Sequence, residues 1–218
     1  MKQSPNAVVK VGGSLIDRIP LLIQQIDTWA VARHQSILIV PGGGIFANSI
    51  RTFQESFGIS DNAAHWMAVL AMEQYAYYIL DRIDIRFNDN LDEFKPGASI
   101  LLPYWLLKRD DRGLPHSWDV TSDTIAAWVA QRTSSKLVKA TDVDGICISG
   151  ELQPRISSHE LMDMERTCVD TALPGFLTRY SMDCIVVNGK YPDRVLAALA
   201  GETAISTVII GRARFKPV

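Results

Sequence analysis

The residues with the clearest chemical potential are a lysine, two glycines and a serine in the order Lys10-x-Gly12-Gly13-Ser14. The residues before and between them are apolar and β-branched, so the pattern predicts a strand that carries Lys10 to a glycine loop. Consecutive glycines let the backbone approach an anion closely, and the loop amides and the lysine can bind phosphate. The spacing matches neither Gly-x4-Gly-Lys-Ser/Thr nor Gly-x-Gly-x-x-Gly, so taken alone it also fits an ordinary turn.

A second glycine loop follows the next apolar run. Residues Ser36–Val40 are predicted to form a strand that ends at Pro41-Gly42-Gly43-Gly44, after which apolar residues recur at helical spacing. Three glycines directly before a helix favour a close approach to a ligand over a flexible turn. The carboxyl ends of parallel strands meet at one edge of a sheet, where ligands bind. We therefore expect both glycine loops to line one cleft.

The segment Thr121-Ser122-Asp123 precedes an alanine-rich helical pattern over 124–131. Either hydroxyl is a natural N-cap, and an aspartate in the first turn suits the helix dipole, so a purely structural interpretation exists. In the competing interpretation, Asp123 orients lysines around a phosphate.

Residues Lys136–Ala140 are predicted to form another strand, with Lys139 near its end. The strand leads into Thr141-x-x-Asp144-Gly145, and Asp-Gly followed by Ile-Cys-Ile predicts a hairpin turn. A long helical pattern over 61–83 carries His65 and Trp66 near its start. These two residues could face a substrate, although a lone histidine on a helix is more often structural.

Composition bounds the class of protein. The 218 residues, 47% of them hydrophobic, suffice for a sizeable core, and we expect a single domain over residues 1–218. The net charge of −2 is spread along the chain, which favours small-molecule partners over nucleic acid or a membrane. No apolar run is long enough to span a bilayer and no secretory leader pattern is present, so we expect a cytoplasmic protein. Alternating strands and helices predict an α/β fold with a mainly parallel sheet covered on both faces.

Four motifs stand in a fixed order: Lys10-x-Gly12-Gly13-Ser14, Gly42-Gly43-Gly44, Thr121-Ser122-Asp123 and Lys139-Ala140-Thr141-x-x-Asp144-Gly145. Together they resemble the amino acid kinase family across essentially the whole chain. The segments His65–Tyr75 and Ser117–Asp123 look most like the branch that phosphorylates an aminomethylfuran phosphate in methanofuran synthesis. The resemblance implies a three-layer αβα sandwich of the carbamate kinase type, around a mainly parallel open sheet of about eight strands. It also implies a homodimer or higher oligomer, with the acceptor over the N-terminal half and the nucleotide over the C-terminal half.

The activity implied is an ATP-dependent phosphotransfer, with Mg²⁺, to a small phosphomonoester such as the aminomethylfuran-methyl phosphate, which becomes a diphosphate. The implied catalytic residues are Lys10 and Asp123. The residues implied for the nucleotide are Lys10, Gly12, Gly13, Ser14, Lys139, Thr141, Asp144 and Gly145, and those for the acceptor are Gly42, Gly43, Gly44, Asp61, His65 and Trp66. Mg²⁺ would bind mainly through phosphate oxygens, so no protein-only metal cluster is expected.

The chain departs from the family pattern after the expected hairpin. Many relatives carry a lysine there, whereas this chain offers only Arg155, so the second cation at the transferred phosphoryl group stays open among Lys139, Arg155 and Lys190. Two alternatives also stay open. The first is an enzyme like a uridylate or isopentenyl phosphate kinase, and the second is a non-catalytic ATP-binding storage or regulatory protein of the same fold.

Overall fold

A computed structural model describes residues 4–164 and 167–212. Its centre is an eight-stranded sheet in the order β3-β4-β2-β1-β5-β9-β10-β8, in which only the β9 and β10 neighbours are antiparallel. The α/β fold and the mainly parallel sheet predicted from the sequence are confirmed. The strands of this sheet are β1 (Ala7–Val11), β2 (Ser36–Pro41), β3 (Arg86–Asn88), β4 (Gly97–Leu101), β5 (Lys136–Thr141), β8 (Arg155–Ser157), β9 (Asp183–Asn188) and β10 (Ser206–Ile210).

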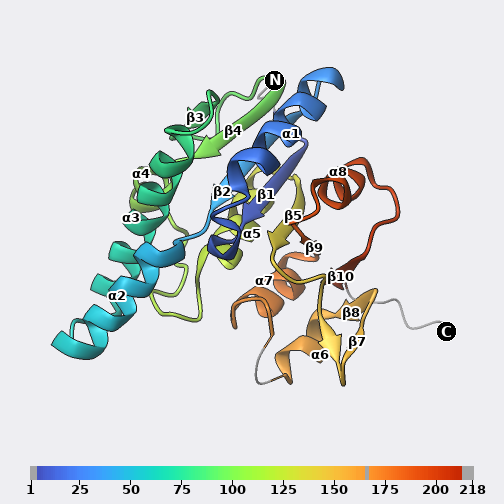
Figure 1. The fold of residues 1–218 in the computed structure, drawn as a ribbon. Coiled ribbons are helices and arrows are strands. Elements are labelled where there is room, and N and C mark those ends of the chain that lie inside the picture. Colours follow the sequence, from blue (N-terminus) through green and yellow to red (C-terminus); the bar gives the residue numbers. More distant parts are fainter. Residues whose placement is uncertain (1–3, 165–166, 213–218) are drawn as a thin grey trace.

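Helices cover both faces of the sheet (Figure 1). They are α1 (Ile19–Ala32), α2 (Gly44–Phe57), α3 (Asp61–Leu80), α4 (Pro103–Arg109), α5 (Ser122–Thr133), α6 (Ser158–Met162), α7 (Leu173–Tyr180) and α8 (Pro192–Ala200). The apolar stripes of α1 and α8 bury one face, and those of α5 and α7 bury the other, while α3 contributes to both cores. No helix in the described ranges is both long and apolar enough to cross a membrane.

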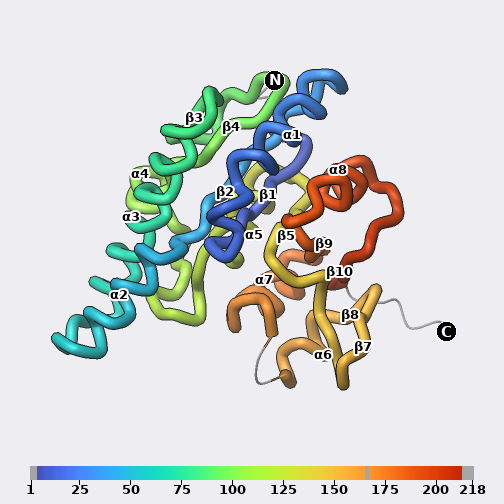
Figure 2. The backbone as a smooth tube through the Cα atoms, viewed as in Figure 1, coloured from blue at the N-terminus to red at the C-terminus, as the bar shows by residue number. Residues whose placement is uncertain are grey.

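The chain completes one half of the sheet before it builds the other half (Figure 2). Strands β1 to β4 form one side, and β5, β8, β9 and β10 form the other, so β1 and β5 are neighbours at the centre. In open α/β sheets, ligands bind at the carboxyl edge where the strand order reverses in this way. The sheet order therefore points to the ends of β1 and β5 as the site.

The register of the two central strands brings two lysines together. Lys10 of β1 is directly beside Lys139 of β5. Side chains alternate between the two faces of a strand, and Val8, two residues before Lys10, belongs to the core under α5. Leu137, two residues before Lys139, belongs to the same core. Both lysines consequently project from the sheet toward α5.

Two local features differ from the sequence predictions. The small hairpin of β6 (Cys147–Ile148) and β7 (Glu151–Leu152) turns at Ser149-Gly150, and not at Asp144-Gly145. Both Ser149 and Gly150 have positive φ angles, 52° and 85°, as a tight hairpin turn of this kind requires. The edge strands β3 and β8 were not predicted, because three-residue strands lack a readable apolar alternation. The aromatic and aliphatic stretch Tyr104–Leu107, for which the sequence allows a short helix or a lid, lies in the helix α4 (Pro103–Arg109).

Candidate functional site

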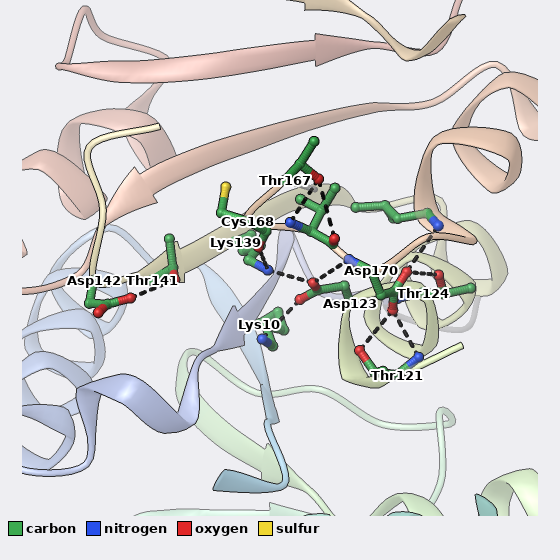
Figure 3. A network of polar contacts seen from close by, with 12 residues as sticks. Lys10, Thr121, Asp123, Thr124, Lys139, Thr141, Asp142, Thr167, Cys168 and Asp170 are labelled. Carbon is green, nitrogen blue, oxygen red and sulfur yellow. Dashed lines mark hydrogen bonds and ion pairs between the residues drawn. The ribbon is translucent and has the colours of Figure 1, made fainter. Parts of the chain in front are cut away.

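Asp123, in the first turn of α5, lies between the two lysines (Figure 3). Its Oδ1 is 2.9 Å from Lys10 Nζ, and its Oδ2 accepts a hydrogen bond from Lys139 Nζ. All three side chains are buried, with exposed fractions of 8% or less. The strand register and the start of α5 thus bring three side chains that are distant in the sequence into one cluster, in which Asp123 contacts both lysines.

The three groups shift one another's pKa values. Burial alone would raise the pKa of Asp123, but the two lysines outweigh it and hold that pKa well below its usual range. Burial would likewise lower the pKa of Lys139, but Asp123 outweighs it and raises the pKa. For Lys10, burial outweighs the attraction of Asp123, and repulsion by Lys139 adds to it, so its pKa is lowered. With one carboxylate for two ammonium groups, the cluster is an electropositive centre suited to an anion.

A cavity of about 480 Å³ opens beside this cluster. Lys10 forms part of its wall, together with both glycine loops, Arg51, His65 and parts of the 117–125 segment, whereas Lys139 does not reach it. Of the two lysines, Lys10 is therefore the one that a ligand in the cavity can touch.

The two glycine loops touch each other at the mouth of this cavity. A Cβ atom on Gly13 would lie 2.3 Å from Gly44 Cα, so a side chain at position 13 would push the loops apart. The N–H groups of Gly12 and Gly42 donate to carbonyl oxygens of the sheet, each at 2.9 Å. These two glycines therefore anchor the loops.

Other amides of the same loops are left for an anion. In residues 4–164 and 167–212, no backbone carbonyl accepts a hydrogen bond from the N–H groups of Gly13, Ser14, Gly43 or Gly44. Gly44 also begins α2, whose N-terminus favours negative charge. Among the loop amides expected to bind phosphate, these four are therefore the ones without a backbone acceptor.

Arg51 is held in the cavity wall by an aromatic stack. Its guanidinium carbon lies 4.1 Å from the ring centroid of Trp118. The Trp118 indole N–H donates to the Gln54 side-chain oxygen, and the Gln54 amide donates to Asp61 at 2.8 Å. Asp61 thus lies outside the cavity lining and supports the stack from α3. No local sequence pattern marks this arrangement, because Trp118 lies 64 residues from Gln54 along the chain.

His65 lines the cavity as a buried, neutral imidazole. Its ring stacks on His116 at a centroid distance of 4.4 Å. Burial and the neighbouring His116 lower the pKa of His65 to about 4, so at pH 7 one ring nitrogen is free to accept a hydrogen bond. Trp66 points elsewhere: it lies outside the cavity lining, edge-on to Tyr104, with Lys108 Nζ 4.3 Å from its ring centroid.

The residues expected around the nucleotide gather at the end of β5. Thr141 is buried there, and Ser14 hydrogen-bonds to the adjacent Asp142. Asp144 accepts hydrogen bonds from Arg194 at 2.7 Å and from Asn188 at 2.8 Å.

Gly145 has a φ of +154°, and a Cβ there would lie 2.3 Å from the Thr207 hydroxyl, so this position needs glycine. Arg155 lies on the edge strand β8, and Lys190 is exposed after β9. Lys139 is therefore the one of the three candidate second cations that contacts Asp123.

Asp170 was not predicted from the sequence as part of the site. The N-cap of α5 is Thr121, one of the two residues expected there, but its side chain makes no capping hydrogen bond. Instead, Asp170 accepts hydrogen bonds from the N–H groups of Thr121 and Thr124. The sequence does carry a signal for a cap on α7, because an aspartate shortly before Leu173-Pro174 suits a helix start. In the structure, Asp170 accepts a hydrogen bond from Leu173 N–H. Its contact with α5 had no signal in the sequence.

Comparisons with known proteins bear on the family and the fold of the chain. No family model matches the chain. The chain is 33% identical to a (5-(aminomethyl)furan-3-yl)methyl phosphate kinase from Methanocaldococcus jannaschii, over 94% of this chain and 97% of that protein. It is 25% identical to a uridylate kinase from Thermofilum pendens, over 96% and 99% of the two chains. Its fold matches a crystal structure of uridylate kinase from Archaeoglobus fulgidus with a TM-score of 0.69 and 20% identity, covering 96% of this chain and all of that one.

The buried charge cluster should make Asp123→Asn strongly destabilising. The substitution leaves two buried lysines without their carboxylate, and breaking such a pair costs about 3–5 kcal/mol. Urea unfolding would measure the loss. The control is Asp110→Asn, which removes a half-exposed carboxylate that pairs with Arg132 at 3.4 Å and should cost about 1 kcal/mol or less. Equal losses in the two variants would contradict a buried, ionised cluster.

His65 should make the folded state sensitive to acid. Its folded pKa of about 4 lies below the ordinary histidine value of 6.5, so its contribution to stability is fully present above pH 6.5 and is lost as the pH falls toward 4. The free energy of unfolding of wild type should therefore fall more between pH 7.5 and 4.5 than that of His65→Gln. The control His159→Gln removes an exposed histidine and should follow wild type. Parallel curves for all three proteins would refute a buried neutral His65.

Proposed function

The chain belongs to the amino acid kinase family, and on that premise we propose that it is an ATP-dependent kinase acting on a small phosphomonoester. The acceptor that we propose is (5-(aminomethyl)furan-3-yl)methyl phosphate, which would become the diphosphate in the synthesis of a methanofuran-type cofactor. The relative at 33% identity supports this acceptor. The observation that carries the kinase activity is the buried Lys10, paired with Asp123, at the wall of a cavity that both glycine loops share.

The chemistry asks the protein mainly for alignment and charge neutralisation. An oxygen of the acceptor phosphate attacks the γ-phosphorus of ATP, and the bond from that phosphorus to the bridging oxygen breaks, which leaves ADP. A phosphate monoester has a second pKa of about 6, so its attacking oxygen is already ionised near pH 7. No general base is then needed.

Lys10 is the cation that we assign to the transferred phosphoryl group. Charge moves onto the bridging oxygen in the transition state, and a fixed ammonium stabilises it there more than in the ground state. Lys139 acts indirectly. It forms an ion pair with Asp123, and Asp123 in turn orients Lys10 toward the cavity. In this proposal residues 1–218 work as one domain, with the nucleotide over the C-terminal half near Ser14, Thr141 and Gly145.

The acceptor phosphate fits the Gly43 and Gly44 amides with Arg51 beside them. The ammonium of the acceptor's aminomethyl group needs a different partner. The charged residues among the described cavity lining are Lys10 and Arg51, and both are cations. The neutral His65 ring nitrogen is an acceptor that can meet it. A homodimer or larger homo-oligomer is also part of this proposal.

Mg²⁺ would bind at this site mainly through the phosphates of ATP. Among the described residues, no group of three His, Cys, Asp or Glu side chains could hold a metal ion. A Mg²⁺ ion prefers phosphate oxygens and water with few protein carboxylates, so it would be held mainly by the ATP phosphates and would neutralise their charge.

A uridylate kinase is the alternative that the relative at 25% identity supports. A panel of the aminomethylfuran phosphate, UMP and isopentenyl phosphate, each with ATP and a coupled assay of ADP release, separates the candidates. We expect the highest kcat/KM with the furan. Preference for UMP would reassign the acceptor, and ATP binding without transfer to any of the three would leave a storage or regulatory protein.

Lys10→Met should lower kcat by about 100-fold or more, because it removes one charge contact to the transition state while it keeps the apolar stem. The KM for ATP should change far less. Lys136→Met is the matched control, since Lys136 lies on the same strand as Lys139 but donates to the last carbonyls of α8. Wild-type kcat in Lys10→Met would rule out the assigned role.

His65→Phe should raise the KM for the furan acceptor by about tenfold or more, since a hydrogen bond to a charged group contributes about 1.5–3 kcal/mol. The phenyl ring still stacks on His116 but cannot accept from the ammonium. Steady-state kinetics should show an unchanged KM for ATP, and little change for an analogue with methyl in place of aminomethyl. An equal rise for both acceptors would mean that His65 does not recognise the ammonium.

A further inference from the structure

The Cys168–Ala172 segment, which precedes α7, contacts both the charge cluster and the start of α5 (Figure 3). The Cys168 carbonyl oxygen accepts a hydrogen bond from Lys139 Nζ. The Asp170 N–H donates to Asp123 Oδ2 at 3.1 Å. The Ala172 N–H donates to the carbonyl oxygen of Asp119, beside the Trp118 wall of the cavity, at 3.0 Å. A single stretch of backbone therefore links the charge cluster to the cavity wall.

The Asp170 carboxylate fixes this stretch against α5. Its Oδ2 accepts from Thr121 N, Thr121 Oγ1 and Thr124 N at 2.8–2.9 Å. Its Oδ1 accepts from Thr124 Oγ1 at 2.6 Å and from Leu173 N at 2.9 Å. Burial and the charge of Asp123 raise the pKa of Asp170, and the five donors oppose that shift because they all favour the ionised form.

This arrangement exceeds what capping a helix requires. Thr121 and Ser122 carry hydroxyls that could cap α5 locally, yet the cap comes from 46 residues away. The same residue that caps α5 with its side chain also binds Asp123 with its backbone N–H. Any shift of Asp170 must therefore move the first turn of α5 and the Asp123 carboxylate together.

We propose that Asp170 is a positioning residue for the phosphoryl transfer: by fixing the start of α5, it sets the direction in which Asp123 aims Lys10 into the cavity. The proposal rests on the kinase function proposed above. Asp170 itself does not line the cavity, so it acts through Asp123. A misplacement of about 1 Å in such an arrangement can cost on the order of 100-fold in rate.

Asp170→Asn is the sharpest variant, because it keeps the size of the side chain and reverses part of its hydrogen bonding. The amide NH₂ must take the place of one oxygen, where it would face two or three donors. A role in filling space predicts no effect, whereas the positioning role predicts a kcat at least tenfold lower with the KM for ATP within twofold of wild type.

Thr124→Val is the milder companion variant, in case Asp170→Asn folds poorly. It removes one donor to Asp170 and keeps the volume, and we expect a several-fold lower kcat. Its matched control is Thr133→Val at the other end of α5. The Thr133 hydroxyl is also buried, but it donates to the Val129 carbonyl oxygen at 2.9 Å, away from the site. Thr133→Val should lose stability comparably and keep the wild-type kcat per folded molecule.

A second measurement does not depend on the activity. The rate of reductive methylation of Lys139, followed by mass spectrometry on the folded full chain, reports whether its buried ammonium is still held. Lys139 is 4% exposed in wild type, and its labelling should rise several-fold in Asp170→Asn and Thr124→Val but not in Thr133→Val.

The outcomes separate the two proposals. Wild-type kcat and wild-type Lys139 labelling in both Asp170→Asn and Thr124→Val would overturn the positioning role while the kinase function stands. The role is also overturned if Thr133→Val lowers kcat as much as Thr124→Val does. Failure of the wild-type protein to phosphorylate any of the three acceptors would overturn the kinase function, and the labelling alone would then decide whether Asp170 holds the lysines.

Discussion

The interaction on which the site depends is the buried contact of one carboxylate with two ammonium groups. Asp123 raises the pKa of Lys139 and opposes the lowering of the Lys10 pKa that burial causes. The sheet makes the contact inevitable, since parallel pairing of β1 and β5 puts the two lysines side by side on the face that α5 covers. The surplus positive charge faces a cavity through Lys10, and this links the fold to anion chemistry.

The two halves of the sheet contribute different residues around the charge cluster. The glycine loop after β2, the start of α3 and the Trp118 segment form the cavity wall, which combines backbone amides, Arg51 and a neutral imidazole. Across β1, the end of β5 and its following loop are held by Thr207, Asn188 and Arg194. A donor and an acceptor bound on the two sides would meet at Lys10. The contact between Gly13 and Gly44 keeps the loops after β1 and β2 close to each other.

The sequence predicted the parts of the site that depend on local patterns. The positions of Lys10 and Lys139 near strand ends and the glycine loops follow from short-range spacing, as does the mainly parallel sheet. It could not predict contacts that depend on register and loop closure. Asp170 reaches α5 across 46 residues, and Trp66 turns away from the cavity that its neighbour His65 lines. The hairpin turn was predicted at Asp144-Gly145 but lies at Ser149-Gly150, because Gly145 packs against Thr207.

The central claim is that the charge cluster transfers a phosphoryl group to a phosphate oxygen of the acceptor, and ³¹P NMR of the reaction tests this most directly. With ATP, Mg²⁺ and the aminomethylfuran phosphate, we predict that the monoester resonance is replaced by two mutually coupled resonances of a diphosphate, in equal amount to the ADP formed. Release of inorganic phosphate with an unchanged monoester resonance, or a new phosphorus signal without coupling to the acceptor phosphate, would contradict the account.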